Sequence, residues 1–451
     1  MEDIGRKLAD LGVSFVDLKL SDLSGKLHHI TFPLSRLKKA LAQGIGFDGS
    51  SLGGFRGLVE SDLIVRPDTS KVTIEPFFER PTASFFGNIY EPDGKTPFTA
   101  CPRNILEKAI EIFTSSGIAD RVVVLVEFEF YVFDDVQIYQ DATESGYIIT
   151  SGEEELALSM KNAYHITNPL DTTANLRSEI ASLIEKAGVK VKYHHHEVGV
   201  HSQVEIETDF MELADAGDAV QLVKYIVKNV VKGQGLYSTF MPKPLAGQAG
   251  SGMHLHVQLW KGEENVFASS TDENELSDTA LNFMGGMIKH SRALCAFTNP
   301  STNSYRRLMG GMEAPKQVFH SRANRKAAIR IPGYVRGAKD LRFEYRVPDA
   351  LTNPYLALAG ILMAGLDGIR NKLSSGPLVV DEPDPADDSF PHLPEDFSQA
   401  LVSLASDYGF LTEPGAFPED VIKKWLKEKE KEIEEISSYP TPAEFIKYFA
   451  F

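Results

Sequence analysis

The sequence predicts an α+β protein with a small N-terminal domain and a large second domain. At 451 residues, the chain is too long for a single ordinary core. Near its start, helix and strand patterns alternate over short distances, which is typical of a small α+β domain. Further along, several strands have one apolar face and one polar face, as in an antiparallel sheet.

The small domain is expected to begin with a short amphipathic helix and a hairpin. Apolar residues at helical spacing predict a helix over residues 3–11. Alternating apolar residues then predict strands over 16–20 and 27–32, and Ser24-Gly25 marks the turn between them. These elements place the N-terminus in a small sheet covered by helices.

The boundary between the domains is expected near Pro102. A glycine-rich segment over residues 44–57 precedes it, and prolines and glycines recur over 91–102. A helical pattern starts directly afterwards, from Arg103. We therefore expect one domain over residues 1–102 and a second over 103–451.

The large domain is expected to alternate helices with strands and to end in a helix. Pro418 opens the last helix, and an aromatic tail over 439–451 is expected to dock on another surface. An acidic, proline-rich stretch over 381–396 predicts a surface loop. Further helices are expected over 173–187, 211–232 and 278–297, and strands over 122–133, 191–207, 252–260 and 341–347.

Composition restricts the classes of function. A net charge of −17 argues against nucleic acid as a general partner, because phosphate backbones require a cationic surface. Two cysteines form no disulfide framework and fit a reducing compartment. No signal peptide is visible, and the longest apolar-rich run, residues 355–366, is too short for a membrane span. We expect a cytoplasmic protein that binds neither membranes nor nucleic acid.

The strand over 122–133 carries the first indication of chemistry. Side chains two residues apart point the same way in a strand, so Glu127 and Glu129 project together from an otherwise apolar segment. Two buried carboxylates are costly unless a positive charge lies between them. A metal ion would supply that charge; a solvated position at the rim of the sheet is the alternative.

Three further strands combine an apolar back with a polar front. Each alone is explained by a half-exposed strand of an antiparallel sheet. Glu197, Glu205 and Glu344 of these strands bring the number of carboxylates, with Glu127 and Glu129, to five. With the imidazole of His254 they form a set of hard ligands that suits Mg²⁺ or Mn²⁺ better than Zn²⁺. The polar fronts comprise His195, Glu197, Gln203 and Glu205; His254, His256 and Gln258; and Arg342, Glu344 and Arg346.

Several arginines lie close in sequence to these strands. Arginine binds carboxylate and phosphate through two parallel hydrogen bonds, although a single arginine is more often a solvated surface residue. Enzymes that transfer phosphoryl groups commonly combine a metal ion with arginines, so this combination favours phosphoryl transfer. No P-loop motif is present in the sequence, so a nucleotide would be bound in another way. These arginines are Arg307, Arg325, Arg330, Arg342 and Arg346.

The chain resembles the type I glutamine synthetases over nearly its whole length. The resemblance implies a β-grasp domain followed by a catalytic domain with a curved, mainly antiparallel sheet flanked by helices. It also implies a homo-oligomer, usually a dodecamer of two hexameric rings, with active sites between subunits. The motifs that carry it are FDGSS (47–51), ESD (60–62), HHHEV (194–198), FMPKPL (240–245), GSGMHLH (250–256), TNPSTNSYRRL (298–308), EAP (313–315), NRKAAIRIP (324–332) and RFEYRVPD (342–349).

The resemblance implies that ATP phosphorylates the γ-carboxylate of L-glutamate and that ammonia then displaces phosphate. Two or more Mg²⁺ or Mn²⁺ ions would assist. One would be held by Glu129, Glu197 and Glu205 on the glutamate side, and another by Glu127, His254 and Glu344 on the nucleotide side.

The resemblance also implies how the substrates are bound. Arg307 would hold the α-carboxylate of glutamate, Arg346 its γ-carboxylate, and Gly250 would offer its backbone to the amino acid. ATP would be bound by His256, Gln258, Arg325, Arg330 and Lys339, with Arg325 and Arg346 also acting in catalysis.

The ammonium site is expected between subunits. Asp48 and Ser51 of the adjacent subunit would form it with Tyr164 and Glu197, and Asp48 would take a proton from ammonium. Glu313 would lie on a flap that closes over the acyl phosphate and excludes water.

The chain departs from the family pattern at three places. Ala249 replaces the usual asparagine beside Gly250, and His201 stands where small residues are usual. The acidic loop contains no tyrosine, so we expect no regulation by adenylylation. Two alternatives to a glutamine synthetase remain open: a γ-glutamyl ligase that uses an organic amine, and a catalytically inactive relative.

Overall fold

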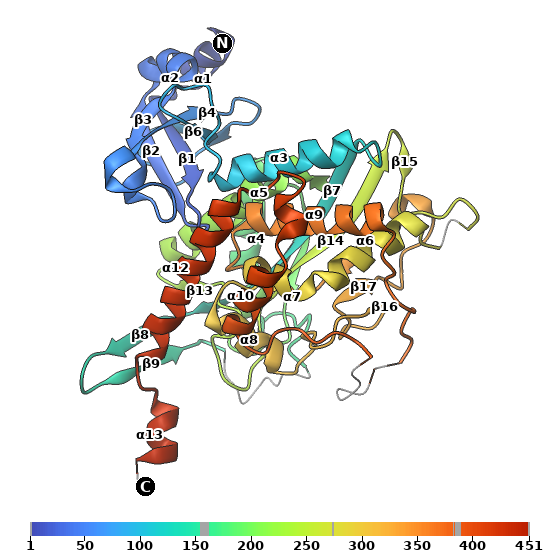
Figure 1. Ribbon diagram of the computed structural model, residues 1–451. Coiled ribbons are helices and arrows are strands. Elements are labelled where there is room, and N and C mark those ends of the chain that lie inside the picture. The colour runs from blue at the N-terminus through green and yellow to red at the C-terminus, as the bar shows by residue number, and fades with distance from the viewer. Residues whose placement is uncertain (1, 154–161, 273–274, 382, 384–388, 450–451) are drawn as a thin grey trace.

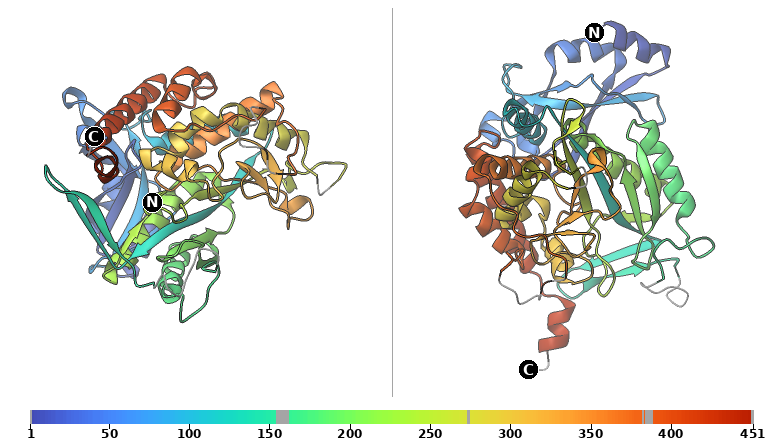
Figure 2. Two further views of the ribbon diagram at one scale, coloured as in Figure 1. Left: turned by 90° about the horizontal axis from the view of Figure 1, so that it is seen from below. Right: turned by 90° about the vertical axis from the view of Figure 1, so that its right-hand side faces the viewer.

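The computed structural model describes residues 2–153, 162–272, 275–381, 383 and 389–449. A small N-terminal part lies at one end of a larger body, and the C-terminal helix extends from the opposite end (Figure 1). The right-hand view of Figure 2 shows the same separation from a second direction. Part of the predicted acidic loop over 381–396 lies outside the described residues.

The small part is built on a six-stranded sheet in the order β2-β1-β6-β4-β3, with β5 paired to β6. β1 pairs antiparallel with β2 and parallel with β6, and the hairpin between β1 and β2 is the predicted one. The strands are β1 (Phe15–Ser21), β2 (Leu27–Pro33), β3 (Ile45–Asp48), β4 (Asp62–Pro67), β5 (Thr73–Ile74) and β6 (Thr82–Tyr90), and the helices are α1 (Glu2–Asp10) and α2 (Leu37–Gln43).

The large part is built on a ten-stranded, mainly antiparallel sheet. Its main path is β10-β11-β7-β14-β18-β17-β16, with β12 and β13 also paired to β7 and β15 to β14. The strands are β7 (Arg121–Phe133), β10 (Val191–His196), β11 (Gln203–Thr208), β12 (Met211–Glu212), β13 (Tyr237–Thr239), β14 (Met253–Lys261), β15 (Glu264–Asn265), β16 (His320–Arg322), β17 (Ile329–Ile331) and β18 (Phe343–Tyr345).

Helices cover the apolar face of this sheet. The helix α9 runs through their middle: Asn353 caps its N-terminus, Pro354 opens it, and most of its side chains are buried. The helices are α3 (Pro102–Ser115), α4 (Ala174–Lys186), α5 (Leu213–Gly233), α6 (Asp278–Lys289), α7 (Ser291–Thr298), α8 (Thr302–Met309), α9 (Pro354–Asn371), α10 (Phe397–Ser406), α11 (Gly409–Thr412), α12 (Glu419–Ser437) and α13 (Pro442–Tyr448).

The single helix predicted over residues 278–297 is wrong. The chain forms α6 and α7 instead, and His290 separates them. The His290 ring lies between two carboxylates from distant segments, 2.7 Å from Asp407 and 2.9 Å from Asp367. These long-range contacts hold the break in the helix.

Two projecting segments expose apolar side chains. The hairpin of β8 (Asp135–Gln140) and β9 (Ser145–Thr150) exposes Ile138 and Ile148, and α13 exposes Ile446 and Phe449. Helix α13 therefore extends away from the body of the molecule (Figure 1 and the right-hand view of Figure 2). None of the helices described is long and apolar enough to cross a membrane.

Candidate active site

A cavity of about 590 Å³ opens on the polar face of the large sheet. Strands β7, β10, β11, β14 and β18 supply its floor, and loops supply its walls. Most of the candidate residues lie together in it, although they come from segments far apart in the sequence. These lining residues are Glu127, Glu129, Tyr164, Glu197, Glu205, Gly250, His254, Arg307, Glu313, Arg325, Arg330, Glu344 and Arg346.

Strand register explains why the acidic side chains meet. In the pairing of β7 with β11, Glu129 lies opposite Glu205, and Glu127 lies opposite Glu207. On its other edge β7 pairs with β14, which places His254 opposite Glu127. Directly opposed residues of adjacent strands have their side chains close together on one face.

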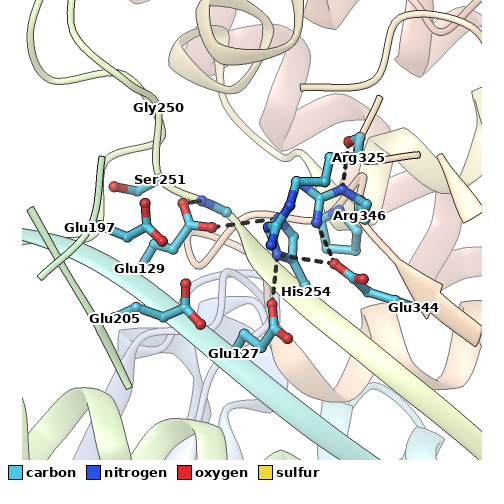
Figure 3. Close-up of polar contacts among 12 residues, drawn as sticks. Glu127, Glu129, Glu197, Glu205, Gly250, Ser251, His254, Arg325, Glu344 and Arg346 are labelled. Carbon is cyan, nitrogen blue, oxygen red and sulfur yellow. Dashed lines mark hydrogen bonds and ion pairs between the residues drawn. The ribbon is translucent and has the colours of Figure 1, made fainter. Parts of the chain in front are cut away.

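The first group, which we call the histidine–arginine cluster, comprises Glu127, His254, His256, Arg330, Glu344 and Arg346. Figure 3 shows Glu127, His254, Glu344 and Arg346 of this cluster. The two carboxylate oxygens of Glu127 lie 2.9 Å from Nδ1 of His254 and 2.8 Å from Nε2 of His256. Glu344 accepts a hydrogen bond of 2.6 Å from Arg330 and another from Arg346. Every carboxylate of this cluster thus has cationic or ring N–H partners within the protein.

These partners determine the pKa values in the cluster. Burial raises the pKa of the Glu344 carboxyl, but the positive charges of Arg346, His256 and His254 together outweigh burial and bring the pKa to about 2. Burial also raises that of Glu127, and hydrogen bonds from His254 and His256 outweigh it, so the pKa lies well below its ordinary value. Both carboxylates are therefore ionised at neutral pH.

The second group, which we call the carboxylate cluster, comprises Glu129, Glu197 and Glu205, with His195 at its edge. The three carboxylates point toward one another (Figure 3). A ring nitrogen of His195 lies 3.7 Å from Glu205 and another 4.0 Å from Glu197. No arginine or lysine makes an ion pair with these three carboxylates among the described residues.

In the carboxylate cluster, the pKa values of Glu197 and Glu205 are raised because buried carboxylates lie close to one another. Burial, followed by the negative charges of Glu205 and Glu129, raises the pKa of Glu197 well above its ordinary value. Burial and the charges of Glu127 and Glu129 do the same to Glu205. The protein donors to this cluster are backbone N–H groups, that of Gly252 at 2.8 Å from Glu129 and that of Val198 at 2.5 Å from Glu197.

Both clusters fit divalent metal ions. Possible ligand atoms of Glu127, His254 and Glu344 lie within 4.8 Å of one another, as do those of His195, Glu197 and Glu205. Oxygen-rich donor sets of this kind suit Mg²⁺ or Mn²⁺. In the second cluster, a cation would also relieve the repulsion that raises the pKa of Glu197 and Glu205.

The arginines occupy different depths. Arg307 is buried, and its guanidinium donates to the backbone carbonyls of Val347, Pro348 and Arg346 at 2.8, 3.2 and 3.0 Å. Arg325 is exposed at the cavity mouth, where the charge of Glu313 outweighs burial and raises its pKa. Glu313 has a φ of 39°, an uncommon conformation for a residue other than glycine.

Five predicted site residues do not line this cavity. His256 is fully buried beneath it, and exposed Lys339 lies outside it. Gln258 donates its amide to the carbonyls of Lys339 and Leu341, both at 3.0 Å, so its visible contacts are structural. Asp48 and Ser51 lie exposed on the small domain.

Hydrogen bonds from neighbouring serines hold the carboxylate of Asp48 in its ionised form. Its carboxylate accepts hydrogen bonds from the backbone and hydroxyl of Ser50 at 2.9 and 2.6 Å, and from Ser51 at 3.0 Å. These bonds, with those of Ser50 first, lower the pKa of Asp48. The carboxylate is ionised and available to another molecule.

The strand pattern contained a further site residue, Glu207, that we did not single out. It continues the alternation of Gln203 and Glu205, and its side chain is fully buried. Nζ of Lys192 lies 2.6 Å from Glu207. Glu207 lies opposite Glu127 in the pairing of β11 with β7, which places its carboxylate beside Glu127 and His256. The pattern of a single strand does not reveal how that strand pairs with its neighbour.

The structure shows where two of the departures from the family pattern, Ala249 and His201, are located. Ala249 is on the cavity wall, and its carbonyl accepts a hydrogen bond of 2.7 Å from the hydroxyl of Tyr131. His201 has a φ of 71° in the turn between β10 and β11, and it does not line the cavity.

Comparison with known proteins agrees with this architecture. Residues 12–92 match the family model of the glutamine synthetase β-grasp domain, and residues 99–448 match that of the glutamine synthetase catalytic domain. A glutamine synthetase of Neisseria gonorrhoeae is 39% identical over 464 residues, covering 97% of this chain and 96% of the relative. Fold, site and these matches together define a ligase of a class that uses ATP and divalent metal ions.

The chain belongs to the glutamine synthetase family and is an enzyme of that family. Solved structures agree. Glutamine synthetase of Plasmodium falciparum superimposes with a TM-score of 0.90 at 26% identity, covering 99% of this chain and 98% of that one. A structure of apo GmaS superimposes with a TM-score of 0.85 at 26% identity, and the match covers 100% of both chains.

Proposed function

We propose that the protein joins ammonia to the γ-carboxylate of L-glutamate, with γ-glutamyl phosphate as the intermediate and L-glutamine, ADP and phosphate as products. One observation carries the proposal: a single cavity contains two groups of side chains that could each hold a cation, and arginines line the same cavity. The arrangement allows ATP and glutamate to meet over Glu127 and Glu129.

In the first step, an oxygen of the glutamate γ-carboxylate attacks the γ-phosphorus of ATP, and the bond to the ADP oxygen breaks. Arg325 and Arg330, which line the cavity, neutralise the transferred phosphoryl group. Arg346 orients the γ-carboxylate, and Arg307 the α-carboxylate. Arg307 makes its present contacts with backbone carbonyls, so binding glutamate requires its guanidinium to share or exchange them.

Divalent metal ions would be held on the nucleotide side by Glu127, His254 and Glu344, and on the glutamate side by Glu129, Glu197 and Glu205. When bound, such ions would polarise phosphate and carboxylate oxygens as Lewis acids. The protein's own contribution is the spacing of the ligands, set by the register of β7 with β11 and β14.

In the second step, ammonia attacks the acyl carbon, the bond from that carbon to the phosphate oxygen breaks, and the nitrogen loses one proton, which leaves with the phosphate as hydrogen phosphate. Before this, ammonium gives a proton to Asp48. Tyr164 and Glu197 line the receiving side of the cavity, and Glu313 closes its mouth against water. His256, Gln258 and Lys339 are assigned to the nucleotide.

A shared site requires an oligomer. Asp48 and Ser51 are exposed and do not line their own subunit's cavity, and Val59, near them in sequence, is 97% exposed. We infer that this loop enters the cavity of the next subunit. Two hexameric rings forming a dodecamer, with α13 joining the rings, would also cover the apolar side chains of that helix.

Two minor assignments complete the proposal. The domains divide at residues 102/103, where α3 begins. A cytoplasmic location fits the two cysteines, Cys101 and Cys295, which are both buried and unpaired.

A γ-glutamyl ligase that uses an organic amine is the second candidate. Ala249 provides only a methyl group on the cavity wall, and Tyr164, Tyr193 and His195 present aromatic surface beside the carboxylates. Aromatic rings near carboxylates can bind an alkylammonium group. Asp48 favours ammonia, because an ammonium-sized site depends on a nearby carboxylate.

The decisive experiment measures glutamate-dependent release of phosphate from ATP. The acceptors would be ammonia, methylamine, ethanolamine and putrescine, each with Mg²⁺. We expect the highest kcat/KM with ammonia. A higher value with an organic amine would replace the main proposal by the second candidate, and no release with any acceptor would indicate an inactive relative.

A second experiment tests the shared site. Asp48→Ala should abolish ammonia-dependent turnover while ATP binding persists, and Glu79→Ala, which removes an exposed carboxylate of the same domain, should leave both unchanged. Mixing and reassembling Asp48→Ala with Glu205→Gln subunits should restore part of the activity. Absence of any restoration would contradict a site built from two subunits.

A further inference from the structure

A second cavity, of about 340 Å³, lies where the small domain meets α5. The β1–β2 hairpin forms one side of it and one face of α5 the other. Its lining is unusually basic for a chain of net charge −17: four lysines and two histidines against one aspartate. These residues are Lys19, Lys26, His28, His29, Lys224, Lys228 and Asp17.

Part of this positive charge is neutralised within the protein. Lys19 is buried and forms ion pairs with Asp17, at 2.8 Å, and with Glu75. The histidines lie beside carboxylates as well, His28 at 3.0 Å from Asp22 and His29 at 2.6 Å from Asp17. These groups form the fixed frame of the cavity.

Three lysines have no such partner. In the part of the chain that the structure describes, Lys26, Lys224 and Lys228 make no ion pair with a carboxylate. Lys224 donates instead to the backbone carbonyl of Ala350 at 2.5 Å. Lys224 and Lys228 are one turn apart on α5, and like charges at this spacing destabilise a helix.

Among the three lysines, the charged form of Lys224 is destabilised most. Burial and then the charge of Lys228 lower the pKa of its ammonium group to about 8. By accessible area the residue is half-buried, so its ammonium group is confined but still reachable from the cavity. Asp349 attracts this ammonium group but forms no ion pair with it, so an anion in the cavity would offset part of the cost of confining the charge.

We propose that this cavity binds a small polyanion, a phosphate ester or a di- or tricarboxylate, between Lys26, Lys224 and Lys228. Its volume accommodates a molecule larger than a single inorganic ion. Three ammonium groups can each donate to an anionic oxygen, which favours a ligand with at least two negative charges.

Such a ligand would act at the junction between the two domains. It would join the β1–β2 hairpin to α5, and α5 also packs against β7, the strand that carries Glu127 and Glu129. Lys19 and Glu75 already link the same surfaces through the hydroxyl of Tyr225, 3.0 Å from Glu75. Ligand binding at this position stabilises the junction, whichever acceptor the active site uses.

The test measures anion binding to the full-length protein by calorimetric titration in Mg²⁺-free buffer. Citrate and pyrophosphate serve as the two probes, because they distinguish a carboxylate from a phosphate ligand. The variant Lys224→Ala/Lys228→Ala removes two of the three unpaired cations. Lys232→Ala is the matched control, because Lys232 lies on the same helix and does not line the cavity.

We expect at least one probe to bind the native protein and the control equally, and the double variant to bind it about tenfold or more weakly. The active-site arginines remain intact in all three proteins, so binding there is an internal reference. Equal binding by all three proteins, or no binding of either probe to the native protein, would overturn the proposal. Neither result depends on ligase activity, so a failure of the proposed function remains distinguishable.

Discussion

The two acidic clusters of the active-site cavity solve the same electrostatic problem in different ways. In the histidine–arginine cluster, protein cations and ring N–H groups satisfy the carboxylates, and the pKa values of Glu127 and Glu344 are lowered. In the carboxylate cluster, Glu197 and Glu205 have no comparable partners, and their pKa values are raised. The carboxylates of the first cluster are therefore neutralised within the protein, whereas those of the second would be stabilised by a cation from outside.

The largest expected effect separates the two clusters by the sign of a stability change. In the metal-free protein, Glu344→Gln should lower the free energy of unfolding by about 3–5 kcal/mol, because it leaves Arg330 and Arg346 buried without a carboxylate. Glu205→Gln makes the same chemical change, yet it should leave stability unchanged or increased because it removes repulsion. Urea unfolding of the chelator-treated proteins measures both.

The isosteric pair serves as its own control, since both substitutions replace one carboxylate oxygen by an amide nitrogen. Two equal losses of stability would show that the clusters do not differ as described. A large loss in Glu205→Gln alone would reverse the comparison.

Adding metal should produce the next largest effect. A ligand that binds only the folded state stabilises it by about 2.7 kcal/mol at a concentration of 100 Kd. Mg²⁺ or Mn²⁺ should therefore raise the unfolding free energy of the native protein, and Glu197→Gln/Glu205→Gln should lose most of this gain. A thermal melt at increasing metal concentration gives the measurement; an undiminished gain in the double variant would place the metal elsewhere.

The pH dependence of metal-free stability should also differ between the clusters. A raised folded-state pKa means that the folded protein holds protons that the unfolded chain has lost. Glu197 and Glu205 should therefore each lower stability by up to about 1.4 kcal/mol per pH unit as the pH rises above about 4.3. Glu344, with a pKa of about 2, contributes stability above pH 4.3 that is lost as the pH falls toward 2.

Unfolding of the metal-free native protein between pH 5 and 8 tests this directly. The slope should become shallower in Glu197→Gln/Glu205→Gln, because the groups responsible are gone. A slope unaffected by the double substitution would assign the pH dependence to other residues.

Alternation along single strands predicted most of the active site. Glu127, Glu129, Glu205 and His254 lie in the cavity because Cβ direction along a strand is a local property. Glu207 continued the same pattern, but its position opposite Glu127 depends on the pairing of β7 with β11, which no single strand reveals.

Long-range contacts account for the remaining failures of prediction. The break between α6 and α7 depends on Asp367 and Asp407, which are distant in sequence from His290. The basic cavity was missed for a similar reason. Its lysines lie on a hairpin and a helix that meet only in the folded chain. From the sequence alone, each lysine would be interpreted as a surface residue.

The smallest expected effect concerns Glu207, whose carboxylate lies beside Glu127 and His256 at the edge of the histidine–arginine cluster. Its side chain is fully buried, and its partner Lys192 is 32% exposed, so solvent screens this pair more than the Glu344 pairs. Lys192→Met should lower the unfolding free energy by only about 1 kcal/mol, and Lys192→Met/Glu207→Gln should regain most of it. A coupling energy near zero in this double-mutant cycle would mean that Lys192 does not neutralise Glu207, which would then resemble Glu205. A coupling energy of about 3 kcal/mol would mean that Lys192 neutralises Glu207 as strongly as the arginines neutralise Glu344.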